Sequence, residues 1–212
     1  LRLANPMQVH NHSSVDLYFE DVLRHAKVIL ISLHGGIGYW RYGVERLGEL
    51  AARGVQIIMV PGCDNPDPEL DERSTAPAED CHRLWQFLRQ GGMHNALDFY
   101  RCLASRMLGR DYPWAEPKPL PRTAVYHPQG VSADPAVWQA QWSADQPVVA
   151  LLFYRSHLQA ANTAFIDVFC ERLLAQGLNP LPIAVASLKE ASCLSVVENW
   201  LDEVDCELIL NT

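Results

Sequence analysis

The chain has 212 residues, of which 49% are hydrophobic and 20% are charged, so it can bury a core and is not compositionally disordered. Its formal charge of −8 argues against nucleic acid as the main partner, because phosphate binding needs a basic face. No apolar run approaches the roughly 20 residues that a membrane-spanning helix needs. We therefore expect a soluble protein, and the opening residues do not have the charged head and apolar segment of a signal peptide.

The first part of the chain has the pattern of a strand–helix–strand unit. Runs of strand length that are apolar at all but one position lie at Val28–Leu33 and Val55–Val60, and apolar residues at helical spacing lie between them, from 44 to 51. This order predicts two parallel strands joined by a helix. A further helix, with Ser13 and Asp16 as its capping box, is expected before the first strand.

A helical pair is expected next. The segment Cys63–Ala76 is polar and rich in turn residues, and it precedes helical patterns at Pro77–Gln90 and Met93–Leu108. The spacing within the second helix predicts that Leu97, Tyr100, Leu103 and Met107 are buried.

Prolines at positions 113, 117, 119 and 121 exclude a helix, so we place an inter-domain linker at residues 109–122. It separates a first α/β unit, residues 1–108 with the helical pair at 77–108, from a second unit at 123–212. The chain starts without Met and stops directly after a strand pattern, so we expect truncation at both ends and an incomplete second unit.

The second unit repeats the alternation of strands and helices. Strands are predicted at Val148–Phe153, Leu181–Val185 and Glu207–Leu210, with helices at 163–176 and 191–203. The fold class that follows is α/β, with two flavodoxin-like or Rossmann-like parallel-sheet units and a helical insertion.

Three polar residues, Arg155, His157 and Asn162, follow the first of these strands. Ligands of open α/β sheets bind beyond the carboxyl ends of the strands, and this trio suits an anionic or metal-bearing ligand. Two simpler interpretations stay open. Arg155 and His157 would then only satisfy backbone carbonyls and solvate a loop, and Asn162 would be the N-cap of the following helix.

Other patterns do not complete an active site. The loop from His34 to Gly38 fits neither a dinucleotide fingerprint nor a P-loop, so its glycines are interpreted as a tight turn before Trp40 and Tyr42 pack. His10 and His12 lack a third ligand for a metal.

The six cysteines show no framework spacing. Three of them, Cys81, Cys102 and Cys170, lie in helical patterns as small hydrophobes. This usage favours a reducing compartment and a cytoplasmic location.

Four segments resemble the large-subunit family of aerobic cobaltochelatase, to which the large subunit of magnesium chelatase is related. They occur in the family's order over nearly the whole chain and cover only the N-terminal portion of that family, and they are Ser14–Leu47, Val60–Leu70, Arg83–Ala104 and Leu151–Glu190.

The resemblance implies the ATP-dependent insertion of Co²⁺ into hydrogenobyrinic acid a,c-diamide during cobalamin biosynthesis. It implies a large subunit that holds the tetrapyrrole, and separate AAA-type ATPase subunits that use ATP and Mg²⁺. No cofactor, metal ligand or catalytic residue is assigned within this chain. The candidate contacts to the macrocycle are Arg155, His157 and Asn162, with His34 and Arg41 behind them.

Three alternatives remain. The chain could belong to a magnesium-chelatase-type large subunit that inserts Mg²⁺ into protoporphyrin. It could be a non-catalytic scaffold that docks the ATPase components, for which the aromatic residues Tyr39, Trp40 and Tyr42 would supply an exposed surface. It could also be a free-standing small-ligand module of the same fold.

Overall fold

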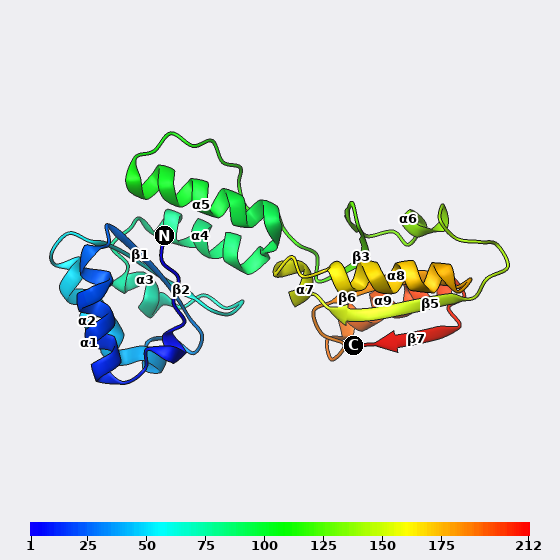
Figure 1. Ribbon diagram of the computed structural model, residues 1–212, viewed down its shortest axis with the longest axis horizontal. Helices are drawn as coiled ribbons and strands as arrows, with labels where there is room; N and C mark the ends of the chain where they lie inside the picture. The colour runs from blue at the N-terminus through cyan, green and yellow to red at the C-terminus, as the bar shows by residue number, and fades with distance from the viewer. The chain divides into compact units, whose positions relative to one another are not determined.

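The computed structural model describes all 212 residues, and these form two compact units, each with its own sheet (Figure 1). The first unit comprises residues 1–90 and 94–118, and the second comprises residues 91–93 and 119–212. Residues 109–121 carry no helix or strand. The expected α/β class with parallel strand–helix–strand units is confirmed.

The first unit is built on a two-stranded parallel sheet, in which Val28 pairs with Gln56 and Leu33 with Pro61. Both strands lie within one residue of their predicted positions. The elements in chain order are η1 (Pro6–Gln8), α1 (His12–Asp21), η2 (Leu23–His25), β1 (Val28–Leu33), η3 (Ile37–Trp40), α2 (Arg41–Ala51), β2 (Gln56–Pro61), α3 (Pro68–Arg73), α4 (Ala78–Gln90) and α5 (Gly92–Leu108).

This small sheet is covered on both faces. Ile57 and Met59 pack in one core with residues of α1 and α2, whereas Ile58 and Val60 pack in a second core with residues of α4 and α5. Successive side chains of a strand point to opposite faces, so a strand buried on both faces reads as a continuous apolar run. The helical pair therefore belongs to the fold of the first unit as the cover of one face.

Helix α3 occupies the segment that was predicted to be a polar turn. Asp67 caps it by accepting hydrogen bonds from the amides of Glu69 (3.1 Å) and Leu70 (3.4 Å), and Pro68 stands at its first position. Leu70 is fully buried, which anchors the helix. A capping Asp followed by Pro is a helix start signal, but a single apolar residue in six gives no periodicity.

One further prediction in this unit is wrong, and another is confirmed only in part. The cap of α1 is Asn11, whose side chain accepts from the amide of Ser14 at 2.8 Å, and not Ser13. Helix α5 buries Met107, as predicted, together with Phe99 and Cys102, and Leu103 packs against the same core, but Leu97 is 49% exposed and Tyr100 is 41% exposed. This helix carries apolar residues on more than one face, so periodicity did not decide which face packs.

The second unit is a five-stranded sheet of order β4-β3-β6-β5-β7. β5 is parallel to both β6 and β7, and all but the last residue of β5 and all of β6 are buried. The elements in chain order are β3 (Thr123–His127), β4 (Gly130–Ser132), α6 (Ala136–Gln139), β5 (Val148–Tyr154), α7 (Ser156–Gln159), α8 (Ala164–Ala175), β6 (Asn179–Val185), α9 (Ala191–Glu203) and β7 (Leu208–Asn211).

The hairpin β3–β4 was not predicted, and it makes the sheet mixed, because β3 is antiparallel to both β4 and β6. Its turn joins His127 to Gly130, and Gly130 adopts φ 149°, a value that favours glycine. Trp138 of α6 packs beside this hairpin and donates from Nε1 to the carbonyl oxygen of Tyr126 in β3 at 2.6 Å. The strands of five and three residues are too short to give a clear alternation.

Candidate functional site at the sheet edge of the second unit

The carboxyl end of β5 lies where the strand order of the second unit reverses. The chain leaves β5 through α8 to reach β6, and then passes back across β5 through α9 to reach β7 on its other side. In open α/β sheets such a reversal point is the usual place for a ligand. The residues that follow β5 are therefore the candidates that the fold itself singles out.

Arg155 sits at this edge but points its donors inward. Its backbone amide donates to the carbonyl oxygen of Val185 at 2.9 Å, and its guanidinium donates to Pro121 (2.9 Å, from Nε) and Leu120 (2.8 Å, from Nη2). The residue is 9% exposed. Arg155 therefore ties the segment before β3 to the end of β5, as the simpler interpretation expected.

His157 lies in α7 and belongs to an aromatic group formed by Tyr126, Phe153, His157 and Phe165. Its ring meets that of Phe165 edge-on at 4.8 Å and lies 6.4 Å from that of Phe153, which meets Tyr126 edge-on at 6.1 Å. The residue is half-buried. Its ring thus packs on the core on one side and keeps part of its surface available to a ligand.

Two residues complete the edge. Asn162 is exposed, and its backbone amide donates to the carbonyl oxygen of His157 at 2.8 Å. The prediction that Asn162 caps the next helix is wrong, because α8 begins after Thr163 and has no side-chain cap. Tyr154, the last residue of β5, is 59% exposed and was missed by the sequence analysis. Side chains alternate between the two faces of a strand, and this alternation at a strand that ends in a polar loop could have indicated that Tyr154 is exposed.

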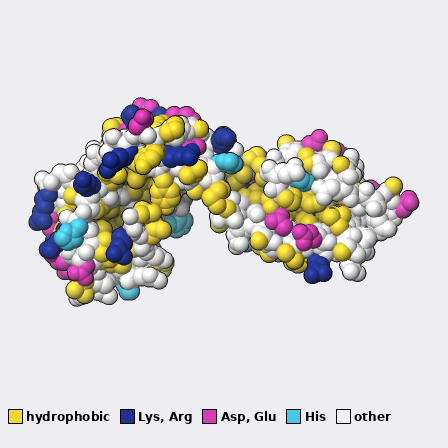
Figure 2. Space-filling model, turned by 45° about the horizontal axis from the view of Figure 1, so that its top comes forward, with side chains coloured by type: hydrophobic (Ala, Val, Ile, Leu, Met, Phe, Trp, Pro, Cys, Tyr) yellow, Lys and Arg dark blue, Asp and Glu magenta, His cyan; other side chains and the backbone are white.

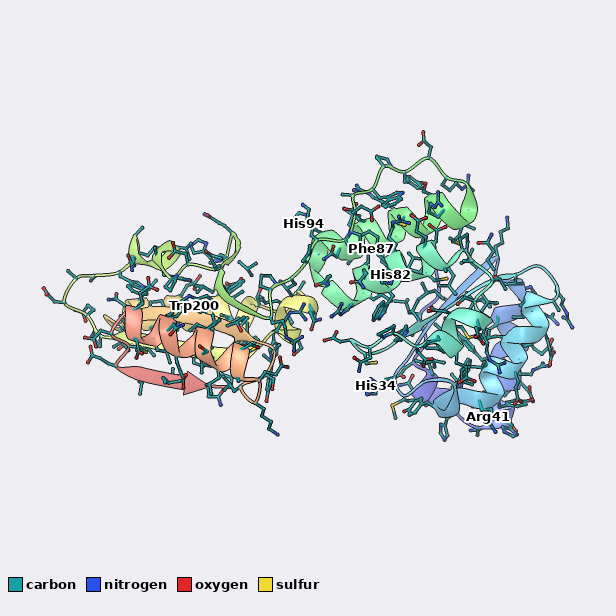
Figure 3. The ribbon with its side chains drawn as sticks, turned by 180° about the vertical axis from the view of Figure 1, so that it is seen from behind. His34, Arg41, His82, Phe87, His94 and Trp200 are labelled. Carbon is teal, nitrogen blue, oxygen red and sulfur yellow. The ribbon has the colours of Figure 1, made fainter.

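His34 and Arg41 belong to the first unit, so the structure does not group them with Arg155, His157 and Asn162. Both are exposed and lie at the periphery of that unit (Figure 3). His34 follows β1, and its Nδ1 is 3.2 Å from the carbonyl oxygen of Gly62. Arg41 is the first residue of α2.

The loop between His34 and Gly38 is the tight turn that the sequence predicted. Gly35 and Gly36 adopt φ values of 90° and 72°, which favour glycine. The loop lets Trp40 pack in the core, where its Nε1 donates to the carbonyl oxygen of Val9 at 2.6 Å. The expected exposed aromatic surface is therefore reduced to Tyr39, which is 50% exposed.

A partly buried polar pair behind the edge was also missed by the sequence analysis. Tyr126 of β3 donates its hydroxyl hydrogen to Asp167 of α8 at 2.8 Å. Burial raises the pKa of Tyr126, and the hydrogen bond to Asp167 raises it further. No short-range pattern links two residues 41 positions apart, and β3 itself was not predicted.

The cysteines are all free, and burial of Cys81, Cys102 and Cys170 is confirmed. Burial raises the pKa of the Cys102 thiol to about 11 and that of Cys170 to about 12. Nowhere do three or more His, Cys, Asp or Glu side chains gather in a way that could hold a metal ion. No helix has the length and apolar character needed to cross a membrane.

These features define a two-unit α/β protein whose second unit offers aromatic and hydrogen-bonding groups at the reversal point of its sheet. A sequence model of the CobN/Magnesium Chelatase family matches residues 85–212, which is more than half of the chain. The chain belongs to this family.

The chain is 67% identical, over all of its 212 residues, to the aerobic cobaltochelatase subunit CobN of Pseudomonas aeruginosa. It is 32% identical to the CobN subunit of a Sinorhizobium species over 220 aligned residues, again with the whole chain covered. It spans 17% of the length of each of these relatives. The catalytic subunit of cobaltochelatase from Mycobacterium tuberculosis has a similar structure, with a TM-score of 0.73 and 26% identity over the whole chain and 16% of that subunit.

Proposed function

We propose that this chain is part of the tetrapyrrole-binding large subunit of a cobaltochelatase. The complete enzyme would insert Co²⁺ into hydrogenobyrinic acid a,c-diamide in the cytoplasm, with Mg²⁺ and ATP used by separate AAA-type ATPase subunits. The observation that carries the proposal is the 67% identity to CobN of Pseudomonas aeruginosa along every residue of the chain.

Within that subunit, the sheet edge of the second unit would contact the macrocycle. The ring of Tyr154 is exposed, and an aromatic side chain offers a large apolar surface with one polar end. His157 and Asn162 can exchange hydrogen bonds with carboxylate or amide groups on the ring periphery. Arg155 donates from Nε and Nη2 to backbone carbonyls, so its contribution would be to position this edge and not to bind the ligand.

The test uses the full-length protein. Tyr154→Ala and His157→Phe are each expected to weaken the binding of hydrogenobyrinic acid a,c-diamide by about tenfold, the effect of losing roughly 1.4 kcal/mol. Tyr112→Ala is the matched control, because Tyr112 is also an exposed tyrosine, at 53%, and lies in the first unit. Unchanged affinity in both variants would show that the edge does not contact the tetrapyrrole.

The metal and the tetrapyrrole need their own test, because the matched family includes magnesium chelatase. The full-length protein, combined with its ATPase subunits, is expected to insert Co²⁺ into the corrin substrate and to leave protoporphyrin with Mg²⁺ unchanged. Insertion of Mg²⁺ into protoporphyrin at a comparable rate would place the protein in the magnesium branch. Insertion that proceeds without ATP would contradict the proposed energy source.

A scaffold role is the second candidate, and the geometry of Arg155 favours it. Its guanidinium is engaged within the unit, as a bracing residue would be. In that case substitutions at the edge would leave tetrapyrrole affinity unchanged and weaken the association with the ATPase subunits. Measuring both quantities on the same variants separates the two roles.

A further inference from the structure

The first unit contains a cavity of about 520 Å³ at the amino-terminal end of its sheet, away from the loops that follow the strands. Lys27 and Gln56 lie at the starts of β1 and β2, Arg53 follows α2, and Arg110 follows α5. A volume of this size falls within the range of about 300–1,000 Å³ that is typical of small-molecule sites. Apolar side chains, among them Met107, complete the wall.

The charged side chains that line this cavity are all cations, namely Lys27, Arg53 and Arg110. None of the three is in an ion pair, although Asp and Glu outnumber Lys and Arg by 25 to 17 in the chain. Lys and Arg side chains stand beside hydrophobic surface on this unit in Figure 2. A cavity with only one sign of charge concentrates ions of the opposite sign.

The carboxyl ends of two helices offset part of this positive charge. Helices α2 and α5 both end beside the cavity, at Ala51 and Leu108, and a helix carboxyl end carries about half a negative charge. Two such ends offset about one of the three positive charges. The cavity keeps an excess of about two positive charges, which helix capping does not explain.

Gln56 supplies an independent observation. Its Oε1 is buried and accepts no hydrogen bond, whereas its backbone amide donates to the carbonyl oxygen of Lys27 at 3.1 Å. A buried acceptor without a partner costs about 1–3 kcal/mol, so such groups are rare in folded proteins. This oxygen is closed off from solvent in the unliganded protein, so a ligand that carries a hydrogen-bond donor would satisfy it once the side chain turns toward the cavity.

We propose that this cavity binds a small organic anion that has phosphate or carboxylate groups, an apolar body and a hydrogen-bond donor. Lys27, Arg53 and Arg110 bind the anionic groups, Met107 packs against the body, and Gln56 accepts from the donor. The site lies wholly within the first unit and is separate from the sheet edge of the second. It does not depend on the function proposed above.

Calorimetry on the full-length protein tests the site with three probes. Adenosine monophosphate presents a phosphate and benzenetricarboxylate presents carboxylates, while adenosine has the body and donors of the first probe without the charge. At least one of the two anions is expected to bind, and adenosine is expected to bind at least about tenfold more weakly than adenosine monophosphate. Binding should weaken as salt rises from about 50 to about 500 mM, because Lys27, Arg53 and Arg110 are exposed and their attraction for an anion is screened.

Two charge reversals, Arg53→Glu and Arg110→Glu, are each expected to weaken binding of the anion by about tenfold or more. Arg172→Glu is the matched control, since Arg172 is an exposed cation of α8 in the second unit. Gln56→Met is expected to keep or raise the thermal stability, because it removes an unsatisfied acceptor, and to weaken binding of a probe that carries a donor.

The outcomes decide the proposal. Binding of both anions, or of one alone, that is lost in the two cavity variants and kept in Arg172→Glu supports it and identifies the anionic group. No binding of either anion at millimolar concentration overturns it, and so does binding that Arg53→Glu and Arg110→Glu leave unchanged. Loss of stability in Gln56→Met would show that Gln56 serves the fold and would remove it from the site.

Discussion

The guanidinium of Arg155 donates to the carbonyl oxygen of Leu120 across 2.8 Å, and these two residues are 35 positions apart in the chain. A second bond, from Nε to the carbonyl oxygen of Pro121, holds the same segment at 2.9 Å. Arg155, the arginine at this sheet edge, therefore fixes the course of the chain into β3. These hydrogen bonds indicate a positioning role for Arg155, in contrast to the ligand-binding role proposed for His157 and Asn162.

Arg155→Ala should destabilise the second unit by about 2–4 kcal/mol, because it removes two charge-assisted hydrogen bonds and leaves their acceptors unpaired. The measurement is amide hydrogen exchange of residues 119–127 in the full-length protein. Faster exchange is expected there, and Arg172→Ala on the exposed face of α8 should leave it unchanged. If exchange stays unchanged while tetrapyrrole affinity falls, Arg155 serves the ligand directly.

His157→Phe should preserve stability to within about 1 kcal/mol, because the new ring can keep the edge-on contact with Phe165. His157→Ala should cost about 2 kcal/mol or more through the loss of that packing. Thermal unfolding of both variants checks this pair. Equal stability losses in the two variants would mean that the ring nitrogens, and not the packing, hold the residue in place.

Two glycines of α2 should respond to alanine in opposite directions. A Cβ at Gly43 would lie 2.2 Å from the ring of Trp40, so Gly43→Ala should destabilise the first unit by about 1–3 kcal/mol. A Cβ at Gly48 meets nothing within 4 Å, so Gly48→Ala should stabilise it by about 0.5–1 kcal/mol. Hydrogen exchange of residues 41–51 measures both, and a destabilising Gly48→Ala would contradict the packing.

The Cys170 thiol should make the second unit sensitive to alkaline pH. Burial raises its pKa from 9.0 to about 12, so the folded state holds the proton over a range in which the unfolded chain has released it. Its stabilising contribution is therefore complete below pH 9.0 and is lost as the pH rises to about 12. The slope is about 1.4 kcal/mol for each pH unit.

Cys170→Ala should remove this slope, so the unfolding free energies of the variant and the parent are compared from about pH 8 to about pH 11. Tyrosines and other thiols titrate in both proteins, and the difference between the two isolates Cys170. In a parallel measurement, Cys170 should be alkylated far more slowly than the exposed Cys63 at about pH 8. Parallel stability curves would show that the thiol is not shielded as the structure indicates.

The sequence predicted the elements whose packing is uniform along their length. Strands β1, β2, β5 and β6 are mostly apolar, and each was placed to within one or two residues because side chains on both faces of these strands pack against a core. Helices α4, α8 and α9 were likewise placed closely. Short elements such as α3 and β3 depend on one cap or one distant partner, which leaves no periodic pattern.

The candidate site was predicted only in part. A polar group after β5 was apparent from Arg155, His157 and Asn162, since a strand that ends at polar residues indicates a sheet edge. The role of each residue could not be predicted, because the hydrogen-bond partners of Arg155 lie 34 and 35 positions away in the chain. The cavity in the first unit was missed altogether, because its cations come from three segments far apart in the chain.

By itself the sequence determined the α/β class, the two strand–helix–strand units and the family resemblance, because these follow from local apolar periodicity and from ordered residue strings. Only the tertiary structure decided which polar side chains are engaged within the fold and which remain open to a ligand. Hydrogen bonds and charge excess depend on the distances between groups that folding brings together, and those distances are not encoded in any local pattern.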